Sequence, residues 1–299
     1  MPIIHVNAGD GLPPEAPLDG DGPVIVMVHG YKYAPGHATE CPHHQIFALD
    51  PVRDCFKVVS WPRGLGFGGQ APGEGLAIGF GWNARGSLWR AYEEAARAGA
   101  ALAGLVATIR ARAPRRPVHA IAHSFGARVV LSALAHLAPG ALGRVILLAG
   151  AEFGHHAGAA LATRAGRAAE IVNVTTREND LFDALLEWLI PAPARGDRSL
   201  GLALGPGPNV LTLQLDDTGT LDVLRGAGFE IAPPAARICH WSPYTRAGAL
   251  PFYGRLLREP DRLSLAQLRA ALPDRATPRW SRLAPDLRLP LPIGRRASF

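Results

Sequence analysis

Short apolar runs alternate with helical stretches along most of this chain, and that alternation constrains the fold more than any other feature. The runs predicted as strands are Val24 to Val28, Cys55 to Ser60, Pro117 to Ala122, Arg144 to Ala149, Ala169 to Thr175 and Val210 to Leu215. The stretches predicted as helices are Leu88 to Ala113, Phe125 to Leu137, Leu181 to Leu189 and Leu263 to Leu272. Apolar strands separated by helices are typical of a mostly parallel central sheet with helices on both faces. The sequence therefore predicts an α/β fold.

Length and charge indicate one domain with a basic tail. A chain of 299 residues, 48% of them hydrophobic, can bury about three quarters of its unfolded surface without help from disulfides or metals. We expect a single α/β domain over residues 1–273 and a Pro- and Arg-rich tail over residues 274–299. The tail holds six arginines and two aspartates, which accounts for +4 of the net charge of +6. The remaining body has no basic face, so we expect no nucleic-acid partner.

The cysteines and the hydropathy predict a cytoplasmic location. Cys41, Cys55 and Cys239 are an odd number and cannot form a closed set of disulfides, so reduced thiols are the simplest interpretation. The first ten residues lack the basic start and apolar run of a targeting signal. No segment approaches the roughly 18 uninterrupted apolar residues of a membrane span. We therefore expect no integral membrane contact.

The most informative motif is a serine between a predicted strand and a predicted helix, in the sequence Ala122-His123-Ser124-Phe125-Gly126. A side chain at such a turn projects from the sheet edge, next to a helix N-terminus that favours negative charge. The turn is strained, so the positions two before and two after the serine must be small, as alanine and glycine are here. The pattern predicts that Ser124 is a nucleophile.

A second motif, His29-Gly30-Tyr31, directly follows the first strong strand. Taken alone it could be an ordinary strand-ending turn with a packed imidazole. Together with the serine turn, it resembles the α/β-hydrolase family, whose nucleophile turn reads G-x-S-x-G; alanine replaces the first glycine here. The resemblance covers residues 23–253 and extends to uncharacterised bacterial serine hydrolases of the esterase/lipase-like branch. It implies that the backbone N–H groups of Tyr31 and Phe125 form the oxyanion hole.

The same resemblance implies a catalytic acid after the serine and a histidine after the acid. Asp180 follows the predicted strand that ends at Thr175 and is our choice for the acid, with Glu178 as the main rival. Asp183 lies about one helical turn too late. The alternative for Asp180 is that it caps the helix beginning at Leu181.

Four histidines follow the serine in the chain: His136, His155, His156 and His240. Only His240 comes after the last predicted strand, in a loop, and we predict that it is the general base. The predicted triad is therefore Ser124, Asp180 and His240.

The segment from Arg63 to Gly86 holds nine glycines. Its residues 64–69 fit G-x-G-x-x-G, but residues 70–73 cannot open a helix promptly, so we exclude dinucleotide binding. We hypothesise that the segment covers the site as a lid. Its aromatic residues would then line an apolar acyl pocket with Trp241; these residues are Phe67, Phe80 and Trp82. A surface insertion is the alternative.

A cluster of possible metal ligands does not change this prediction. The cluster is His37, Cys41, His43 and His44, whose spacing fits no standard zinc pattern. We expect a serine hydrolase that needs no metal or cofactor and cleaves a small-molecule or lipid-like carboxylic ester through an acyl-enzyme. A thioesterase, an amidase and a non-catalytic binding protein of the same fold are the alternatives.

Overall fold

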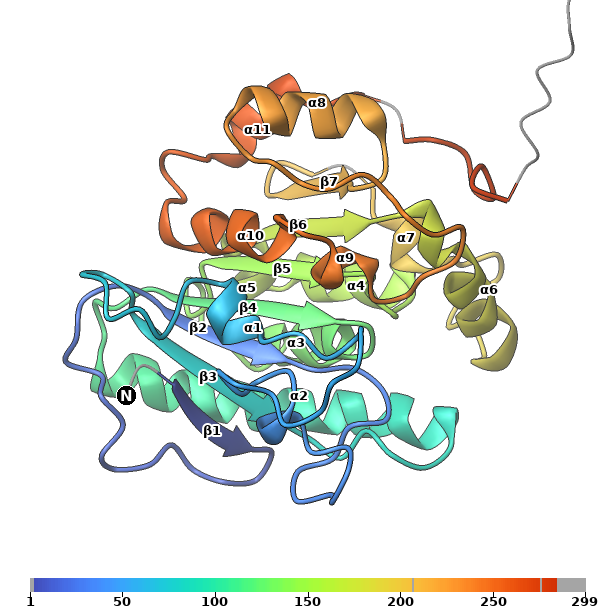
Figure 1. Ribbon diagram of the computed structural model, residues 1–299. Coiled ribbons are helices and arrows are strands. Elements are labelled where there is room, and N and C mark those ends of the chain that lie inside the picture. The colour runs from blue at the N-terminus through green and yellow to red at the C-terminus, as the bar shows by residue number, and fades with distance from the viewer. Residues whose placement is uncertain (1–2, 206, 275, 284–299) are drawn as a thin grey trace, which may run out of the picture.

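A seven-stranded sheet forms the centre of the molecule. The computed structural model describes residues 3–205, 207–274 and 276–283. The strands lie in the order β1-β3-β2-β4-β5-β6-β7, and every neighbouring pair is parallel (Figure 1). Their bounds are β1 Ile3–Asn7, β2 Val24–Val28, β3 Leu76–Gly81, β4 Val118–His123, β5 Arg144–Leu148, β6 Glu170–Thr175 and β7 Val210–Gln214. The predicted parallel α/β architecture is confirmed.

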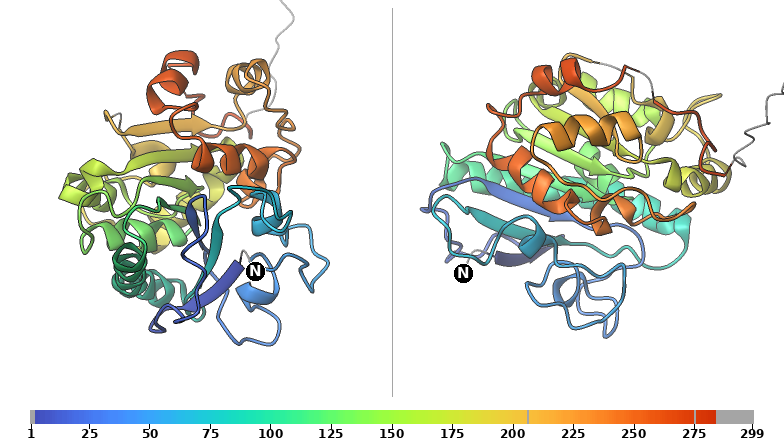
Figure 2. Two further views of the ribbon diagram at one scale, coloured as in Figure 1. Left: turned by 90° about the vertical axis from the view of Figure 1, so that its left-hand side faces the viewer. Right: turned by 45° about the horizontal axis from the view of Figure 1, so that its top comes forward.

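Helices cover both faces of the sheet, as the edge-on view in Figure 2 shows. The helices on one face are α2 (Leu88–Arg112), α3 (Gly126–Leu134), α4 (Gly154–Ala162) and α5 (Arg164–Ala168). The other face carries α1 (Trp61–Gly64), α8 (Thr218–Gly226), α9 (Ser242–Thr245), α10 (Ala249–Arg258) and α11 (Leu265–Ala271). The remaining helical elements are α6 (Asp180–Leu189), α7 (Leu200–Ala203) and the 3-10 turns η1 (Pro42–His44) and η2 (Arg177–Asn179).

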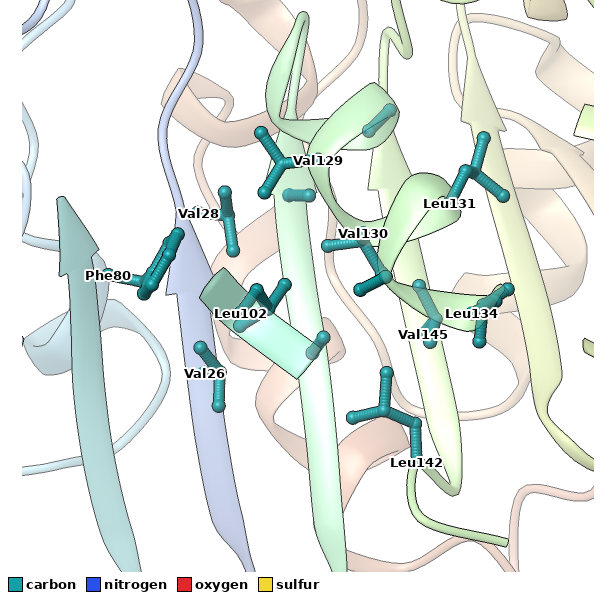
Figure 3. Packing of buried hydrophobic residues seen from close by; sticks show 14 of the residues in the cluster. Val26, Val28, Phe80, Leu102, Val129, Val130, Leu131, Leu134, Leu142 and Val145 are labelled. Carbon is teal, nitrogen blue, oxygen red and sulfur yellow. The ribbon is translucent and has the colours of Figure 1, made fainter. Parts of the chain in front are cut away.

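The apolar strands explain why both faces need cover. All five residues of β2 are buried, and successive side chains of a strand point to opposite faces. Val26 and Val28 accordingly pack in the same cluster as Val129 and Val130 of α3 (Figure 3), whereas Ile25 joins the cluster on the other face. A strand buried on both faces is the usual state in a parallel sheet.

The glycine-rich segment differs most from the prediction. It contains β3, which lies between β1 and β2 in the sheet, and is therefore no lid. Its aromatic residues Phe67, Phe80 and Trp82 are all buried in the core. A Cβ added to Gly79 would lie 2.9 Å from the Phe47 ring, so this glycine leaves room for a packed side chain. Glycine is rare in strands, which are usually rich in Val and Ile. The glycines of β3 are therefore the reason that the sequence pattern did not predict this strand.

Residues 55–60, the first strand and the basic tail also differ from the prediction or extend it. Residues 55–60, predicted as a strand, form a loop, and β1 was not predicted. The described beginning of the basic tail packs against α6, because Arg279 Nη1 lies 2.8 Å from the Glu187 carboxylate. The rest of the predicted tail, residues 284–299, lies outside the described residues. No helix in the described ranges is long and apolar enough to cross a membrane.

The strand order places a crevice at one end of the sheet. β2 lies between β3 and β4, so the chain continues from β2 to one side and from β4 to the other. Open parallel sheets bind ligands at such a switch point, beyond the carboxyl ends of the strands. Val28 pairs with Ala122, so β2 and β4 end at the same level. The His29–Gly30 turn and Ser124 therefore lie beside each other.

Candidate active site

Ser124 occupies a strained turn between β4 and α3. Its φ angle is 56°, in the left-handed region that non-glycine residues rarely adopt. The turn is held by its own backbone: the Ser124 N–H donates to Leu148 O at 3.1 Å, and its carbonyl accepts from Ala127 and Ala151 at 3.0 Å. Such a conformation costs on the order of 1–3 kcal/mol and is typical of functional sites. The structure therefore has the local geometry expected of a nucleophile turn.

Two glycines allow the ends of β2 and β4 to approach closely. A Cβ added to Gly126 would lie 2.6 Å from Val28 O, so the position two after the serine accepts only hydrogen. A Cβ added to Gly30 would lie 2.6 Å from the Ser124 Cβ and 3.2 Å from its Oγ. The His29–Gly30 turn is therefore packed directly against the serine side chain.

The predicted oxyanion donors lie beside the serine. Tyr31 and Phe125 both line the cavity that contains Ser124. Their backbone N–H groups donate to no protein acceptor within the described ranges. Phe125 immediately precedes α3, whose N-terminal end favours negative charge. Two unpaired amides near one hydroxyl could stabilise an oxyanion that forms there.

The imidazole of His29 fixes the turn that carries the Tyr31 amide. Trp82 donates its backbone N–H to His29 Nε2 at 3.1 Å, so Nδ1 holds the ring proton and donates to Gly30 O at 2.9 Å. The Trp82 indole N–H donates to His29 O at 3.0 Å. Burial lowers the pKa of His29 to about 3, which keeps the ring neutral. Trp82 thus supports the turn from the core and does not line the cavity.

His240 lies in the loop before α9 and lines the same cavity as Ser124. Its Nδ1 is 2.6 Å from Asn179 Oδ1 and donates a proton to it, which leaves Nε2 unprotonated. Its ring stacks on Phe182 at 4.6 Å and lies 4.5 Å from the ring of His123. Burial, with a smaller contribution from His123, holds the pKa of His240 well below its usual value. The ring is therefore a neutral acceptor at neutral pH.

His123 supports His240 from behind. Its Nε2–H donates to the His240 carbonyl at 2.9 Å, so the residue before the serine is tied to the histidine loop. No hydrogen bond of the Ser124 hydroxyl is formed within the described residues, and catalytic hydrogen bonds are often long in unliganded enzymes. The structure thus brings Ser124 and His240 to one cavity without joining them.

The structure does not bring Asp180 to His240, contrary to the prediction. The Asp180 carboxylate accepts instead from Arg177 Nη1 at 3.1 Å and from the Trp280 backbone N–H at 2.6 Å. The residue before it, Asn179, contacts the imidazole. A one-residue difference at a strand end turns the side chain in another direction, which sequence order alone could not resolve.

Glu178, the alternative acid, does not contact the His240 imidazole either. It bonds instead to the loop that carries His240. Its carboxylate pairs with Arg246 and accepts the Ala236 N–H at 3.2 Å. Its carbonyl accepts the Cys239 N–H at 2.9 Å, one residue before His240. Arg246 also donates to Leu215 O at 2.6 Å. Glu178 therefore positions the histidine through the backbone.

The cavity has a volume of about 380 Å³. Trp241 lines it, whereas Phe67, Phe80 and Trp82, which we expected in the pocket, do not. Its apolar wall comes from α6 and the start of α2: Leu88, Phe182, Leu185, Leu186 and Leu189. The sequence held a signal for this wall, because the α6 residues follow the i, i+3, i+4, i+7 spacing of one helix face. The Trp89 indole N–H joins the two helices by donating to Leu189 O at 2.6 Å.

The seven-stranded parallel sheet with helices on both faces is consistent with the α/β-hydrolase fold. Residues 16–146 match a family model described as an alpha/beta hydrolase of unknown function (DUF900). The match includes the His29–Gly30 turn and Ser124 and ends before Asn179 and His240. No curated protein matches the chain. The family match therefore supports the class of protein and assigns no chemistry to the site.

Proposed function

We propose that the protein is a serine hydrolase that cleaves carboxylic esters through an acyl-enzyme on Ser124. The observation that carries the proposal is the strained turn of Ser124, which lines one cavity with a neutral His240 and two unpaired backbone amides. A nucleophile, a base and electrophilic donors are the three parts that acyl transfer requires.

In the acylation step, Ser124 Oγ forms a bond to the ester carbonyl carbon while its proton moves to His240 Nε2. The carbonyl oxygen becomes an oxyanion and accepts from the Tyr31 and Phe125 amides. The bond to the alcohol oxygen then breaks, and Nε2 returns the proton to the leaving alcohol. In deacylation, water attacks the acyl group, gives its proton to His240 and releases the acid, and Ser124 recovers its proton.

Asn179 orients the histidine without adding charge. Its side-chain oxygen accepts the Nδ1 proton, which selects the tautomer whose Nε2 can accept from the serine. A neutral amide stabilises the imidazolium less than a carboxylate would. The pKa of His240 is therefore low, and we expect hydrolysis to persist into mildly acidic solution.

The apolar wall of α6 favours an acyl chain as the group bound beside Ser124. Leu185, Leu186 and Leu189 all line the cavity, and burying each methylene contributes about 0.8 kcal/mol. We propose an ester substrate with an apolar acyl group. Thioesters and amides are the alternative substrates, because the same catalytic groups can cleave esters, thioesters and amides.

Hydrolysis of p-nitrophenyl esters from acetyl to octanoyl tests the proposal. We expect turnover by the wild type, and a loss on the order of 10⁴-fold in Ser124→Ala and His240→Ala. Matching thioesters and anilides measure the preference for the leaving atom. Binding of an ester without turnover by the wild type would support the non-catalytic alternative instead.

A further inference from the structure

The only two lysines of the chain, Lys32 and Lys57, both line the cavity that contains Ser124 and His240. Buried arginines donate to fixed acceptors inside the fold: Arg144, for example, donates to Leu256 O at 2.8 Å. The planar guanidinium suits fixed acceptors, whereas the lysine ammonium is a compact charge on a flexible stem. Such a charge suits a ligand that arrives and leaves.

Lys57 lies beside the loop that carries His240. Its Nζ is 5.4 Å from the centre of the Trp241 ring, and Trp241 directly follows His240. The Tyr244 hydroxyl donates to Lys57 O at 3.0 Å, which holds the backbone of the lysine in place. In the proposed reaction, His240 gives its proton to the alcohol oxygen. The ammonium is therefore placed near the alcohol part of the ester.

Lys32 is held in a strained conformation one residue after Tyr31. Its φ angle is 76°, and its backbone is tied by N–H donation to Ala84 O at 2.9 Å and by Arg85 Nη1 donating to its carbonyl at 3.1 Å. Its Nζ lies 5.9 Å from the Tyr31 ring, which also lines the cavity. Backbone strain of this kind is typical of ligand-binding positions.

Among the described residues, the lining offers no free negative charge to neutralise these lysines. Glu40 is the one carboxylate among the described lining residues, and its Oε1 is 2.9 Å from Arg53 Nη1. Within the described ranges, neither lysine forms an ion pair with a carboxylate. The histidines that line the cavity are neutral, since burial lowers the pKa of both His123 and His240. The cavity therefore attracts an anion.

We propose that Lys57, with Lys32 as a second positive charge, binds a carboxylate or phosphate in the alcohol part of the ester. The natural substrate would then join an apolar acyl group, bound along α6, to an anionic alcohol. This inference rests on the proposed esterase function and adds to it the chemical class of the substrate.

Three hexanoyl esters test the proposal: those of 4-hydroxybenzoate, of 4-hydroxyphenyl phosphate and of the neutral 4-hydroxybenzamide. The ratio of kcat/KM for each anionic ester to that for the neutral ester is compared among variants, so that intrinsic reactivity cancels. We expect Lys57→Met to lower the ratio about tenfold and Lys32→Met to lower it less. Lys57→Arg should retain most of the ratio, and salt should lower it in the wild type. The ester whose ratio falls more from the wild type to Lys57→Met identifies the anion.

Arg90→Met is the matched control, because Arg90 is an exposed cation near the start of α2 that does not line the cavity. It should leave the ratio as it is in the wild type. A ratio that is the same in Lys57→Met and the wild type would overturn the anion site, while turnover of the neutral ester would still support the esterase.

A binding measurement tests the anion site independently of ester hydrolysis. The Ser124→Ala protein is titrated calorimetrically with the hexanoyl amide of 4-aminobenzoate and with that of 4-aminobenzamide. We expect tighter binding of the benzoate, and loss of the difference when Lys57→Met is added. That result without any ester turnover would leave the anion site standing and refute the esterase. Equal binding of both amides would overturn the anion site.

Discussion

The Nδ1 atom of His240 lies 2.6 Å from the side-chain oxygen of Asn179, so the imidazole is oriented by a neutral amide. Replacing that amide with a carboxylate, Asn179→Asp, should raise the pKa of the ring, because a nearby negative charge favours the imidazolium. The base must be neutral to accept the serine proton. The acidic limb of the kcat/KM profile should therefore move to higher pH, which a pH–rate series from pH 4 to 9 would measure.

The neighbouring carboxyls provide the comparison. Asp180→Asn should leave the position of the acidic limb unchanged, since Asp180 bonds to Arg177 and Trp280. A shift of the limb in Asp180→Asn, with none in Asn179→Asp, would return the acid role to Asp180. Glu178→Gln should lower the free energy of unfolding, because Glu178 forms a buried ion pair with Arg246. It should leave the acidic limb of the kcat/KM profile nearly unchanged.

Gly30→Ala should lower ester turnover about 10²-fold without unfolding the protein. The added methyl would lie 2.6 Å from the Ser124 Cβ and 3.2 Å from its Oγ, so the nucleophile would have to move. A displacement near 1 Å in an active site can cost about 10²-fold in rate. Ester turnover and far-UV circular dichroism measure the two effects. Gly104→Ala in α2, where a Cβ meets nothing within 4 Å, is the control and should keep full activity.

Filling the apolar wall should change the acyl preference. Leu185 lines the cavity from α6, and Leu185→Trp would shorten the space for the chain. We expect kcat/KM for the octanoyl ester to fall about tenfold relative to the acetyl ester. Trp188→Ala on the same helix, which alters an exposed side chain outside the cavity lining, is the control. An unchanged preference in Leu185→Trp would place the acyl chain elsewhere.

The buried Asp183 should make stability depend on pH. Burial raises its pKa to about 7, above the value near 3.9 expected in the unfolded chain. The folded state then binds the proton more tightly, so its contribution is present below pH 4 and is lost as the pH rises towards 7. Asp183→Asn should raise the free energy of unfolding at pH 8 by up to about 4 kcal/mol and change it little at pH 4. Urea unfolding at both pH values measures this, with the exposed Asp222→Asn as control.

The sequence predicted the parts of the fold that have regular apolar patterns. The strands β2, β4, β5, β6 and β7 and the helices α2, α3, α6 and α11 all lie within a few residues of their predicted ranges. It did not predict β3, because Gly79 and Gly81 remove the β-branched signature where neighbouring side chains need the space.

The site shows the same division. Residues fixed by a local turn, such as Ser124 and the His29–Gly30 pair, could be identified from short motifs. The partner of His240 could not, because it depends on how η2 rotates three successive polar residues at 178–180 after β6. The apolar wall lies on α6. The helical periodicity of α6 is visible in the sequence, but it does not predict that this face of the helix lines the cavity.

Covalent labelling with a small fluorophosphonate shows whether Ser124 is an activated nucleophile. The labelled protein is digested, and peptide mass spectrometry locates the adduct. We predict one adduct per chain, on Ser124, slower labelling in His240→Ala and none in Ser124→Ala, because the neutral imidazole must accept the serine proton. An adduct on another residue, or labelling of Ser124→Ala at the rate of the wild type, would contradict the account.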